Sequence, residues 1–181
     1  EAFQSQFHTG NRDCLSQECV VSCPVARRVN GMIGDSKTKP MEILLVEDGL
    51  TDARVTIFAV RRSHVYHRLT LVRTVNEAIC FLNREGIFAR APRPDLLLLD
   101  MMLPDGCGLD VLETFSEWEP AKRPTTVVLT ASNDPKLLER CNELKVHDLI
   151  GKPVHEDEFM RVVREHKKLM IHGAQTLSSV T

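Results

Sequence analysis

The stretch "LLLLDMMLPDGCG", residues 96–108, decides the fold class of this chain. Four leucines run directly into a carboxylate, Asp100, and turn-forming proline and glycine residues follow closely. A short apolar run bounded by turn residues is typical of a strand that is buried on both faces, as in a parallel sheet. Asp100 would then stand at the carboxyl end of this strand, where open α/β sheets place their ligand sites. Taken alone, an aspartate in this place is equally compatible with a simple cap on the strand or on the next helix.

From residue 41 onward, segments with strand and helix patterns alternate along the chain. Strands are predicted at residues 42–48, 69–74, 95–100, 125–132 and 147–153. Helices are predicted at 51–63, 75–82 and 107–116, then from Asp134 and Pro135 onward, and at 159–170. Such alternation implies right-handed crossovers and an α/β fold, a doubly wound five-stranded parallel sheet with five helices. The pattern does not specify the order of the strands in the sheet.

Apolar residues that recur every three or four positions predict the face that each helix turns toward the sheet. These residues are Ala53, Ile57, Phe58 and Val60 in the first helix, Val75, Ala78, Ile79 and Leu82 in the second, and Leu109, Val111, Leu112 and Phe115 in the third. They are Leu137, Leu138, Cys141 and Leu144 in the fourth helix, and Phe159, Val162, Val163, His166, Leu169 and Met170 in the fifth. Asp134 and Pro135 are typical of an N-cap and a first helical position.

Length and composition restrict the class of protein. A chain of 181 residues can hold one domain with tails and bury a core of its own. The formal net charge of −2, without a long basic block, gives no reason to expect direct binding of nucleic acid. No apolar run approaches the ~18 residues of a membrane span, and the N-terminus lacks the pattern of a signal peptide. We therefore expect a soluble, cytoplasmic protein without a membrane partner.

The first 40 residues differ in character from the rest. They are predicted to be an N-terminal extension, disordered or not native, that ends in the polar linker "GDSKTKP" at 34–40. A single domain is predicted at 41–171, with a C-terminal tail at 172–181. Under this interpretation Met32 or Met41 is the natural start.

The six cysteines fall into two groups. Cys14, Cys19 and Cys23 are close together, with His8 nearby, and a zinc site there is conceivable. Their intervals of five and four residues contain no C-x-x-C knuckle, so the signal for zinc is weak. The other three, Cys80, Cys107 and Cys141, are interpreted as ordinary core or surface thiols.

Polar residues stand at the carboxyl ends of the predicted strands. Glu47 and Asp48 end the first strand, Asp100 ends the third, Thr130 lies at the end of the fourth, and Lys152 follows the fifth. Parallel strands bring such ends to one rim of a sheet. Three carboxylates gathered there would repel one another unless a cation lay between them. Carboxylate oxygens suit Mg²⁺, which is therefore the expected cofactor.

The same rim has the groups that phosphoryl transfer needs. A metal ion and Lys152 would offset developing negative charge, Thr130 would donate a hydrogen bond, and a carboxylate would accept the group. Each residue also has an ordinary interpretation, because acidic strand ends, a threonine in a strand and a lysine in a loop are common. The combination of all of them favours a phosphoryl site.

These segments resemble, in order and spacing, the receiver domain of two-component response regulators. The resemblance rests on "ILLVED" with Glu47 and Asp48, "LLLLDMMLPDGCG" with Asp100, "VVLTAS" with Thr130, "GKP" with Lys152, and Gly108 at the family's loop glycine. It covers roughly residues 41–171 and implies a flavodoxin-like receiver fold. Within the family, "REG" and "FARAPRPDLLLLD" look most like the stand-alone receivers that are paired with bacterial phytochrome-type kinases.

The resemblance implies a phosphoacceptor and its helpers. Asp100 would attack a phosphohistidine of a sensor histidine kinase or a phosphotransfer protein and become an aspartyl phosphate. Thr130 would bond a phosphoryl oxygen, and Lys152 would pair with Asp100 or with its phosphate. The protein would phosphorylate and dephosphorylate itself and would not be a turnover enzyme.

The resemblance also implies a set of metal ligands. Asp48, Asp100 and the backbone carbonyl of Met102 would bind Mg²⁺ directly, and Glu47 would act through a bound water. Metal binding and phosphorylation would then belong to one group of residues.

Two positions depart from the family pattern. Leu149 stands three residues before Lys152, where receivers usually have an aromatic residue that moves inward on phosphorylation. We therefore expect a different or weaker conformational readout at this switch position. Met102 is apolar where the family side chain faces the attacking water, so an altered rate of dephosphorylation is expected.

The chain leaves little room for an output domain of its own. Only 29 residues follow Lys152 (181 − 152), and the first 40 lack helical periodicity. A single-domain receiver would signal by partner binding, by forming a homodimer or by passing phosphate onward in a phosphorelay. The alternatives are a non-switching pseudo-receiver that serves as an interaction module, and a phosphatase of the haloacid dehalogenase type. The latter would need a second aspartate at position 102, where this chain has Met102.

Overall fold

We describe the fold from a computed structural model, which describes residues 39–131, 134–166 and 169. Most of the predicted extension 1–40, with His8 and its three neighbouring cysteines, lies outside these residues, as do Met170 and the tail 172–181. Within the described part, no helix combines the length and the apolar character that a membrane span needs.

Five parallel strands form the sheet that the sequence predicts. Their order is β2-β1-β3-β6-β7, and their bounds are β1 Met41–Val46, β2 His67–Val72, β3 Leu96–Asp100, β6 Thr125–Thr130 and β7 Asp148–Gly151. The doubly wound α/β prediction is therefore confirmed, and the order places β3 at the centre.

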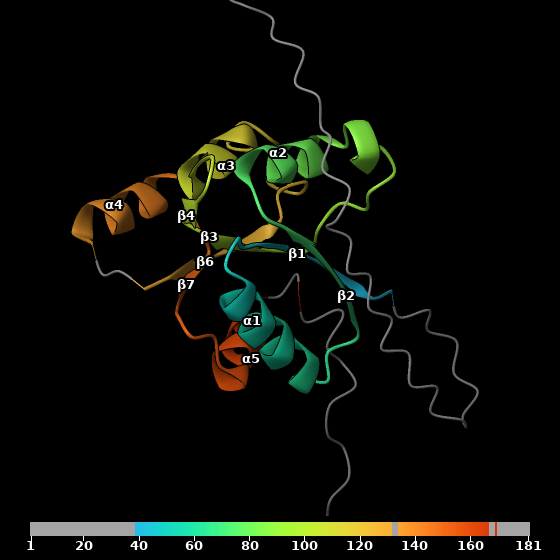
Figure 1. The fold of residues 1–181 in the computed structure, drawn as a ribbon, viewed down its shortest axis with the longest axis vertical. Coiled ribbons are helices and arrows are strands. Elements are labelled where there is room, and N and C mark those ends of the chain that lie inside the picture. Colours follow the sequence, from blue (N-terminus) through green and yellow to red (C-terminus); the bar gives the residue numbers. More distant parts are fainter. Residues whose placement is uncertain (1–38, 132–133, 167–168, 170–181) are drawn as a thin grey trace, which may run out of the picture.

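Five helices cover the two faces of this sheet, as Figure 1 shows. Helices α1 (Leu50–Arg62) and α5 (Glu156–Glu165) pack on one face, and α2 (Val75–Asn83) and α3 (Gly108–Thr114) pack on the other. Helix α4 (Pro135–Glu143) packs beside α3 through Cys141, and a short 3-10 turn, η1, spans Gly86–Phe88.

The leucine run of β3 is the scaffold that the opening stretch predicts. All four leucines are completely buried. Leu96 and Leu98 pack against the α1 and α5 side, whereas Leu97 and Leu99 pack against the α2 and α3 side. Full burial of one such side chain stabilises a fold by about 1.5–3 kcal/mol. Asp100, the last residue of β3, is thus held by a strand with a core on each face.

Strand β2 is shifted from the predicted segment 69–74. It begins two residues before residue 69 and ends two residues before residue 74. It pairs in parallel with β1, from His67 opposite Met41 to Val72 opposite Val46. The Thr74 hydroxyl is instead the N-cap of α2, where it accepts a hydrogen bond from the Glu77 amide at 3.1 Å. The β-rich composition of residues 69–74 could not show which residues of the segment pair with β1.

The prediction that Phe58 faces the core is wrong. Ala53, Thr56 and Val60, spaced by three and four residues, form the buried face of α1, and Phe58 points away from it with 62% of its surface exposed. The Arg62 guanidinium lies over the Phe58 ring, 5.6 Å from its centroid. Thr56, and not the expected Phe58, therefore lies on the inward face of α1.

Helices α4 and α5 also differ from the sequence prediction. In α4 only Cys141 is buried, and the predicted inward residues Leu137, Leu138 and Leu144 are half-buried. Helix α5 ends at Glu165, so His166 is its C-cap and not an interior residue. The predicted helix start at Asp134 and Pro135 is confirmed, since Asp134 Oδ1 accepts the Lys136 amide at 3.0 Å.

A small hairpin between β3 and α3 escaped prediction. Strands β4 (Met102–Leu103) and β5 (Gly106–Cys107) pair antiparallel. The carboxylate of Asp105, in their turn, accepts the amides of Val75 at 2.7 Å and Asn76 at 3.0 Å. The hairpin is thereby tied to the start of α2.

Candidate functional site

The carboxyl ends of the strands bring the predicted polar residues to one rim. Glu47 and Asp48 follow β1, Asp100 ends β3, Thr130 ends β6 and Lys152 follows β7. The Lys152 amide donates to the Thr130 carbonyl at 2.9 Å, which aligns the last two of these segments. We call Glu47, Asp48, Asp100 and Lys152 the acidic rim.

Lys152 lies at the centre of the acidic rim. Its Nζ is 2.5 Å from Asp100 Oδ2 and 2.6 Å from Glu47 Oε2. Asp52 Oδ2, on the first turn of α1, is 3.3 Å away. Burial lowers the pKa of the Lys152 ammonium, but its contacts with Asp100 and Glu47 outweigh this effect and raise the pKa above its usual value. Lys152 therefore stays charged and compensates part of the negative charge at the rim.

Glu47 is the most deeply buried carboxylate of the rim, with 1% of its surface exposed. Its Oε1 accepts the Gly49 amide at 3.1 Å. Its Oε2 forms the ion pair with Lys152 but has no hydrogen bond of normal geometry among the described residues. Burial raises the pKa of Glu47, and the charge of Asp100 adds to this rise while Lys152 opposes it. A cation or a water would relieve this buried oxygen.

The orientation of Asp100 is fixed from two sides. Oδ1 accepts the Met102 amide at 3.1 Å, and Oδ2 pairs with Lys152. Close by, the Gly108 amide donates to the Met101 carbonyl at 3.1 Å. A Cβ atom at Gly108 would lie 2.6 Å from the Asp100 carbonyl oxygen, so this close approach needs a glycine.

The acidic rim has the donor set of a hard cation. Glu47, Asp48 and Asp100 each offer a carboxylate oxygen, and these oxygens lie within 4.8 Å of one another. Three carboxylates against one ammonium leave an excess of negative charge. Oxygen ligands of this kind suit Mg²⁺ or a similar divalent ion. The residues present therefore fit the metal that the sequence predicts.

Two predicted site residues outside the acidic rim are less defined by the structure. The Met102 side chain points into solvent, with 80% of its surface exposed, and the role of its carbonyl as a metal ligand stays a prediction. Thr130 is half-buried at the end of β6, and its contact with a phosphoryl oxygen likewise stays a prediction.

Sequence reasoning missed two residues that shape the site. Asp52 pairs with Lys152, and its place in the first turn of the helix that follows the acidic pair could have indicated it. Arg73, after β2, donates from Nη2 to the Asp48 carbonyl at 2.7 Å and so holds the loop that carries the acidic pair. No local pattern distinguishes Arg73 from an ordinary surface arginine.

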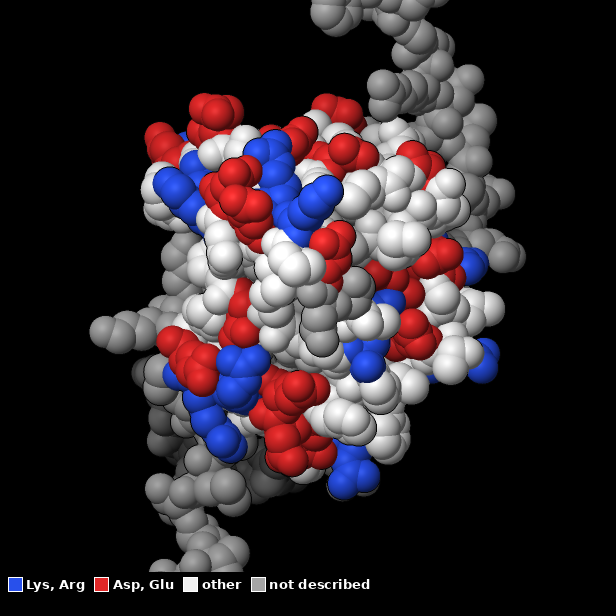
Figure 2. All heavy atoms as spheres, turned by 90° about the vertical axis from the view of Figure 1, so that its left-hand side faces the viewer, with Lys and Arg blue, Asp and Glu red and all other residues white. Residues whose placement is uncertain are grey.

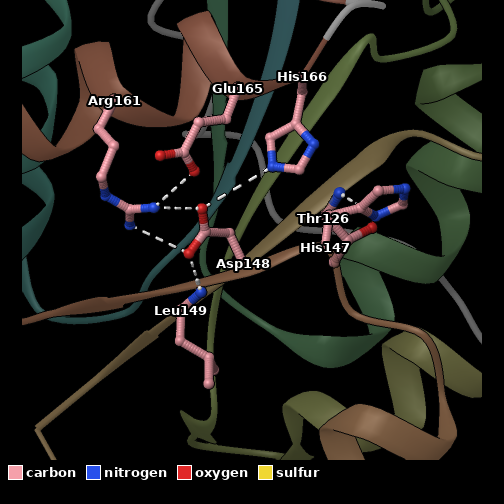
Figure 3. Close-up of polar contacts among 7 residues, drawn as sticks. All are labelled: Thr126, His147, Asp148, Leu149, Arg161, Glu165 and His166. Atoms are coloured by element: carbon pink, nitrogen blue, oxygen red, sulfur yellow. Dashed lines mark hydrogen bonds and ion pairs between the residues drawn. The ribbon is translucent and has the colours of Figure 1, made fainter.

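The switch position, Leu149, lies on the edge strand β7 opposite Val128 of β6. Its half-buried side chain packs with Cys141 and Leu137 of α4, and it points away from the contact between Asp148 and Arg161 (Figure 3). This aliphatic side chain thus takes part in the packing between β7 and α4.

Comparison with known proteins decides the family. A model of the response regulator receiver domain matches residues 43–164. The chain belongs to this family. This receiver is 32% identical over 132 residues to the response regulator Rcp1 of Synechocystis sp., which covers 73% of this chain and 90% of Rcp1.

Solved structures place the receiver near phytochrome response regulators. The phosphorylated cyanobacterial phytochrome response regulator RcpA superposes with a TM-score of 0.62 at 33% identity, over 77% of this chain and all (100%) of that chain. The bacteriophytochrome response regulator RtBRR gives a TM-score of 0.63 at 30% identity, over 79% of this chain and 82% of that chain. An Mn²⁺-bound form of Rcp1 gives a TM-score of 0.60 at 30% identity, over 78% of this chain and 100% of that chain.

Figure 2 looks onto the side of the receiver that is at left in Figure 1, where β1 and β3 end. Acidic and basic side chains are mixed across this side, and uncharged areas lie between them. Neither sign of charge dominates this side.

Proposed function

We propose that this receiver accepts a phosphoryl group on Asp100 from a histidine kinase or a phosphotransfer protein, in a reaction that depends on Mg²⁺. One observation carries the proposal: Lys152 Nζ pairs with Asp100 Oδ2 at 2.5 Å inside a cluster of three carboxylates. The family and its phytochrome-associated relatives support the same reaction.

The reaction needs a carboxylate that is held in place. A carboxylate oxygen of Asp100 attacks the phosphorus atom, the bond from phosphorus to the histidine nitrogen breaks, and the leaving nitrogen keeps the electron pair and takes a proton from solvent. The Met102 amide and Lys152 orient Asp100 before the reaction. Lys152 also offsets charge on the phosphoryl oxygens, and Thr130, at the end of β6, would donate a hydrogen bond to one of them.

Glu47, Asp48 and Asp100 would hold the metal, together with the Met102 carbonyl and bound water. When bound, Mg²⁺ would supply positive charge to the phosphoryl oxygens. The Mn²⁺-bound form of Rcp1 supports the binding of a divalent ion by this receiver. We expect Mg²⁺ because few carboxylates and several waters suit its small, rigid coordination shell.

An apolar surface beside the rim fits the kinase. Leu50, at the start of α1, is 57% exposed, and Phe58 lies further along the same helix. Val55, Phe58 and Val154 line a shallow groove between α1 and the start of α5. A kinase helix that brings a phosphohistidine to Asp100 could bury this surface. Exposed apolar groups of this kind mark interaction sites.

The output of the receiver would be a change in binding. Phosphorylation would shift a conformational equilibrium near β7 and α4, and a partner or a second copy of the chain would recognise the shifted state. We infer that the receiver acts in the cytoplasm, that it dephosphorylates itself and that it turns over no separate substrate.

The decisive experiment uses acetyl phosphate as a small phosphodonor. The receiver is incubated with acetyl phosphate, with Mg²⁺ or with EDTA, and its intact mass is measured beside that of Asp100→Asn. We expect a gain of one phosphoryl group only with Mg²⁺ and only in the natural chain. A mass gain in Asp100→Asn, or an equal mass gain in the presence of EDTA, would contradict the proposal.

The second candidate is a module that binds its partner without switching. Leu149 favours it, because this aliphatic side chain stands at the sequence position of the family's aromatic switch residue and packs against Val128 and Cys141. Amide spectra recorded before and after phosphorylation separate the two functions. Shifts confined to the acidic rim would favour the module, whereas shifts that extend to β7 and α4 would favour the switch.

A further inference from the structure

A second pocket lies at the opposite end of the sheet from the acidic rim. It has a volume of about 200 Å³ and sits where β6 and β7 begin. One wall is apolar and is made by Phe115, Pro120 and Leu144. Arg123, Lys145 and His147 supply polar groups, and none of the described residues that line the pocket is an aspartate or a glutamate. The pocket is too small for a drug-sized molecule but large enough for a fragment.

The Arg123 guanidinium is held in position before any ligand arrives. Its Nε donates to the Trp118 carbonyl at 2.7 Å, and its Nη2 donates to the Ser116 carbonyl. Both carbonyls belong to the segment that follows α3. An arginine oriented in this way loses little side-chain entropy when it binds an anion.

Lys145 adds a second positive charge to the pocket. It follows the C-cap of α4 in the left-handed region, with φ of 58°. Within the described part of the chain, its ammonium has no carboxylate partner within ion-pair distance, whereas Arg140 on the same helix has two, Glu113 and Glu143. The helix dipole favours a lysine near a helix C-terminus. It does not account for the lack of acidic side chains among the described residues that line the pocket.

His147, just before β7, is fixed to β6. The Thr126 amide donates to His147 Nδ1 at 3.1 Å (Figure 3). The imidazole is thus a fixed polar edge of the pocket.

We propose that this pocket binds a small carboxylate with a flat apolar body. The carboxylate lies beside the positive charges of Lys145 and Arg123, and the body packs on Phe115 and Leu144. Such a ligand satisfies the charged side and the apolar wall at once, whereas a bare anion would leave the wall exposed to water. The site shares no residue with the acidic rim and goes beyond the proposed phosphorylation.

Trp118, the single tryptophan of the chain, reports on this pocket. Its ring centroid lies 5.9 Å from that of Phe115, and its carbonyl holds Arg123. The full chain is titrated with benzoate at constant ionic strength while tryptophan emission is recorded. Benzyl alcohol tests the apolar body alone, and inorganic phosphate tests the charge alone. We expect saturation with benzoate, and at least several-fold weaker responses to the other two.

Variants separate specific binding from general effects on fluorescence. Lys145→Gln should weaken benzoate binding several-fold, and Lys136→Gln, an exposed change outside the pocket on α4, should leave it unchanged. Lys145→Asn is a second variant, because asparagine tolerates the left-handed backbone. No saturation with benzoate, an equal response to benzyl alcohol or phosphate, or unchanged binding in both Lys145 variants would overturn the proposal. The titration uses no phosphodonor, so it is independent of Asp100 phosphorylation.

Discussion

At the scale of single residues, Gly108 shows how the main chain around Asp100 depends on one missing side chain. The change Gly108→Ala would place a Cβ atom 2.6 Å from the Asp100 carbonyl oxygen and 3.0 Å from Met101 Sδ. Overpacking of this kind costs about 1–3 kcal/mol. We expect a lower urea midpoint for unfolding. Gly151→Ala is the matched control, because no atom of the described residues lies within 4 Å of the Cβ added there. Equal midpoints for both variants would show that the loop relaxes without cost.

Met102 lies beside Asp100 and is the natural place to alter the lifetime of a phosphoryl group. Its exposed thioether is a poor partner for the water that must attack the aspartyl phosphate. In Met102→Asn, an amide could hold this water, so we expect the phosphate half-life to shorten several-fold. Met102→Leu keeps an apolar side chain of similar volume and should retain the original half-life. The half-life is followed by intact mass after removal of the phosphodonor. An unchanged half-life in the asparagine variant would rule out this role.

At the scale of elements, β7 and α5 are joined by Asp148 and Arg161. Arg161 donates from both terminal nitrogens to Asp148, at 2.8 and 3.0 Å, and the Leu149 amide adds a third bond (Figure 3). Burial tends to raise the pKa of Asp148, but these donors outweigh burial and lower the pKa below its usual value. The charged carboxylate is thus the form that links the two elements.

A pH dependence follows from this lowered pKa. The contribution of Asp148 is fully present above the ~3.9 of an unperturbed aspartate and is lost as pH falls through the lower folded-state value. At neutral pH, Asp148→Asn should lower the free energy of unfolding by about 1 kcal/mol. This difference should shrink as the pH falls below that range. Urea unfolding of both proteins over the acidic range measures it.

The matched control is Glu165→Gln on α5. Glu165 also pairs with Arg161, at 2.9 Å, but it is half exposed and lies one helical turn away. Pairs of this kind contribute about 0.3–0.5 kcal/mol, so the control should change little. Parallel pH curves for the natural protein and Asp148→Asn would contradict the assignment.

At the scale of the whole molecule, the features that the sequence predicted correctly are those that repeat or that follow from topology. The leucines before Asp100 could be recognised because a central parallel strand is apolar on both faces. Glu47, Asp48 and Lys152 could be placed together because parallel strands share one rim, and Figure 1 shows β1 and β3 ending on the same side of the sheet. Both predictions hold for any order of the strands in the sheet.

The features that escaped prediction depend on contacts distant in sequence. Phe58 is apolar, yet Thr56 takes the inward position because helix α1 turns that face to the sheet. The hairpin of β4 and β5 has strands of only two residues, too short for a periodic pattern, and is fixed by Asp105 at the start of α2. Arg73 reaches the Asp48 carbonyl across 25 positions of sequence. Local patterns contain no information about such contacts.

Metal binding at the acidic rim is coupled to the stability of the whole fold. A ligand that binds only the folded state stabilises it by RT ln(1 + [L]/Kd), which is about 2.7 kcal/mol at one hundred times Kd. Mg²⁺ should therefore raise the Tm of the natural chain and should fail to do so in Asp48→Asn, which removes one carboxylate of the metal cluster. Asp52→Asn removes a neighbouring carboxylate that contacts Lys152 but is not part of the cluster, so it should keep the response.

Because mutual repulsion at the rim is relieved in Asp48→Asn, its Tm without metal should equal or exceed that of the natural chain. A metal response that survives Asp48→Asn, or that is lost in Asp52→Asn, would mean that the cation binds by a different set of oxygens.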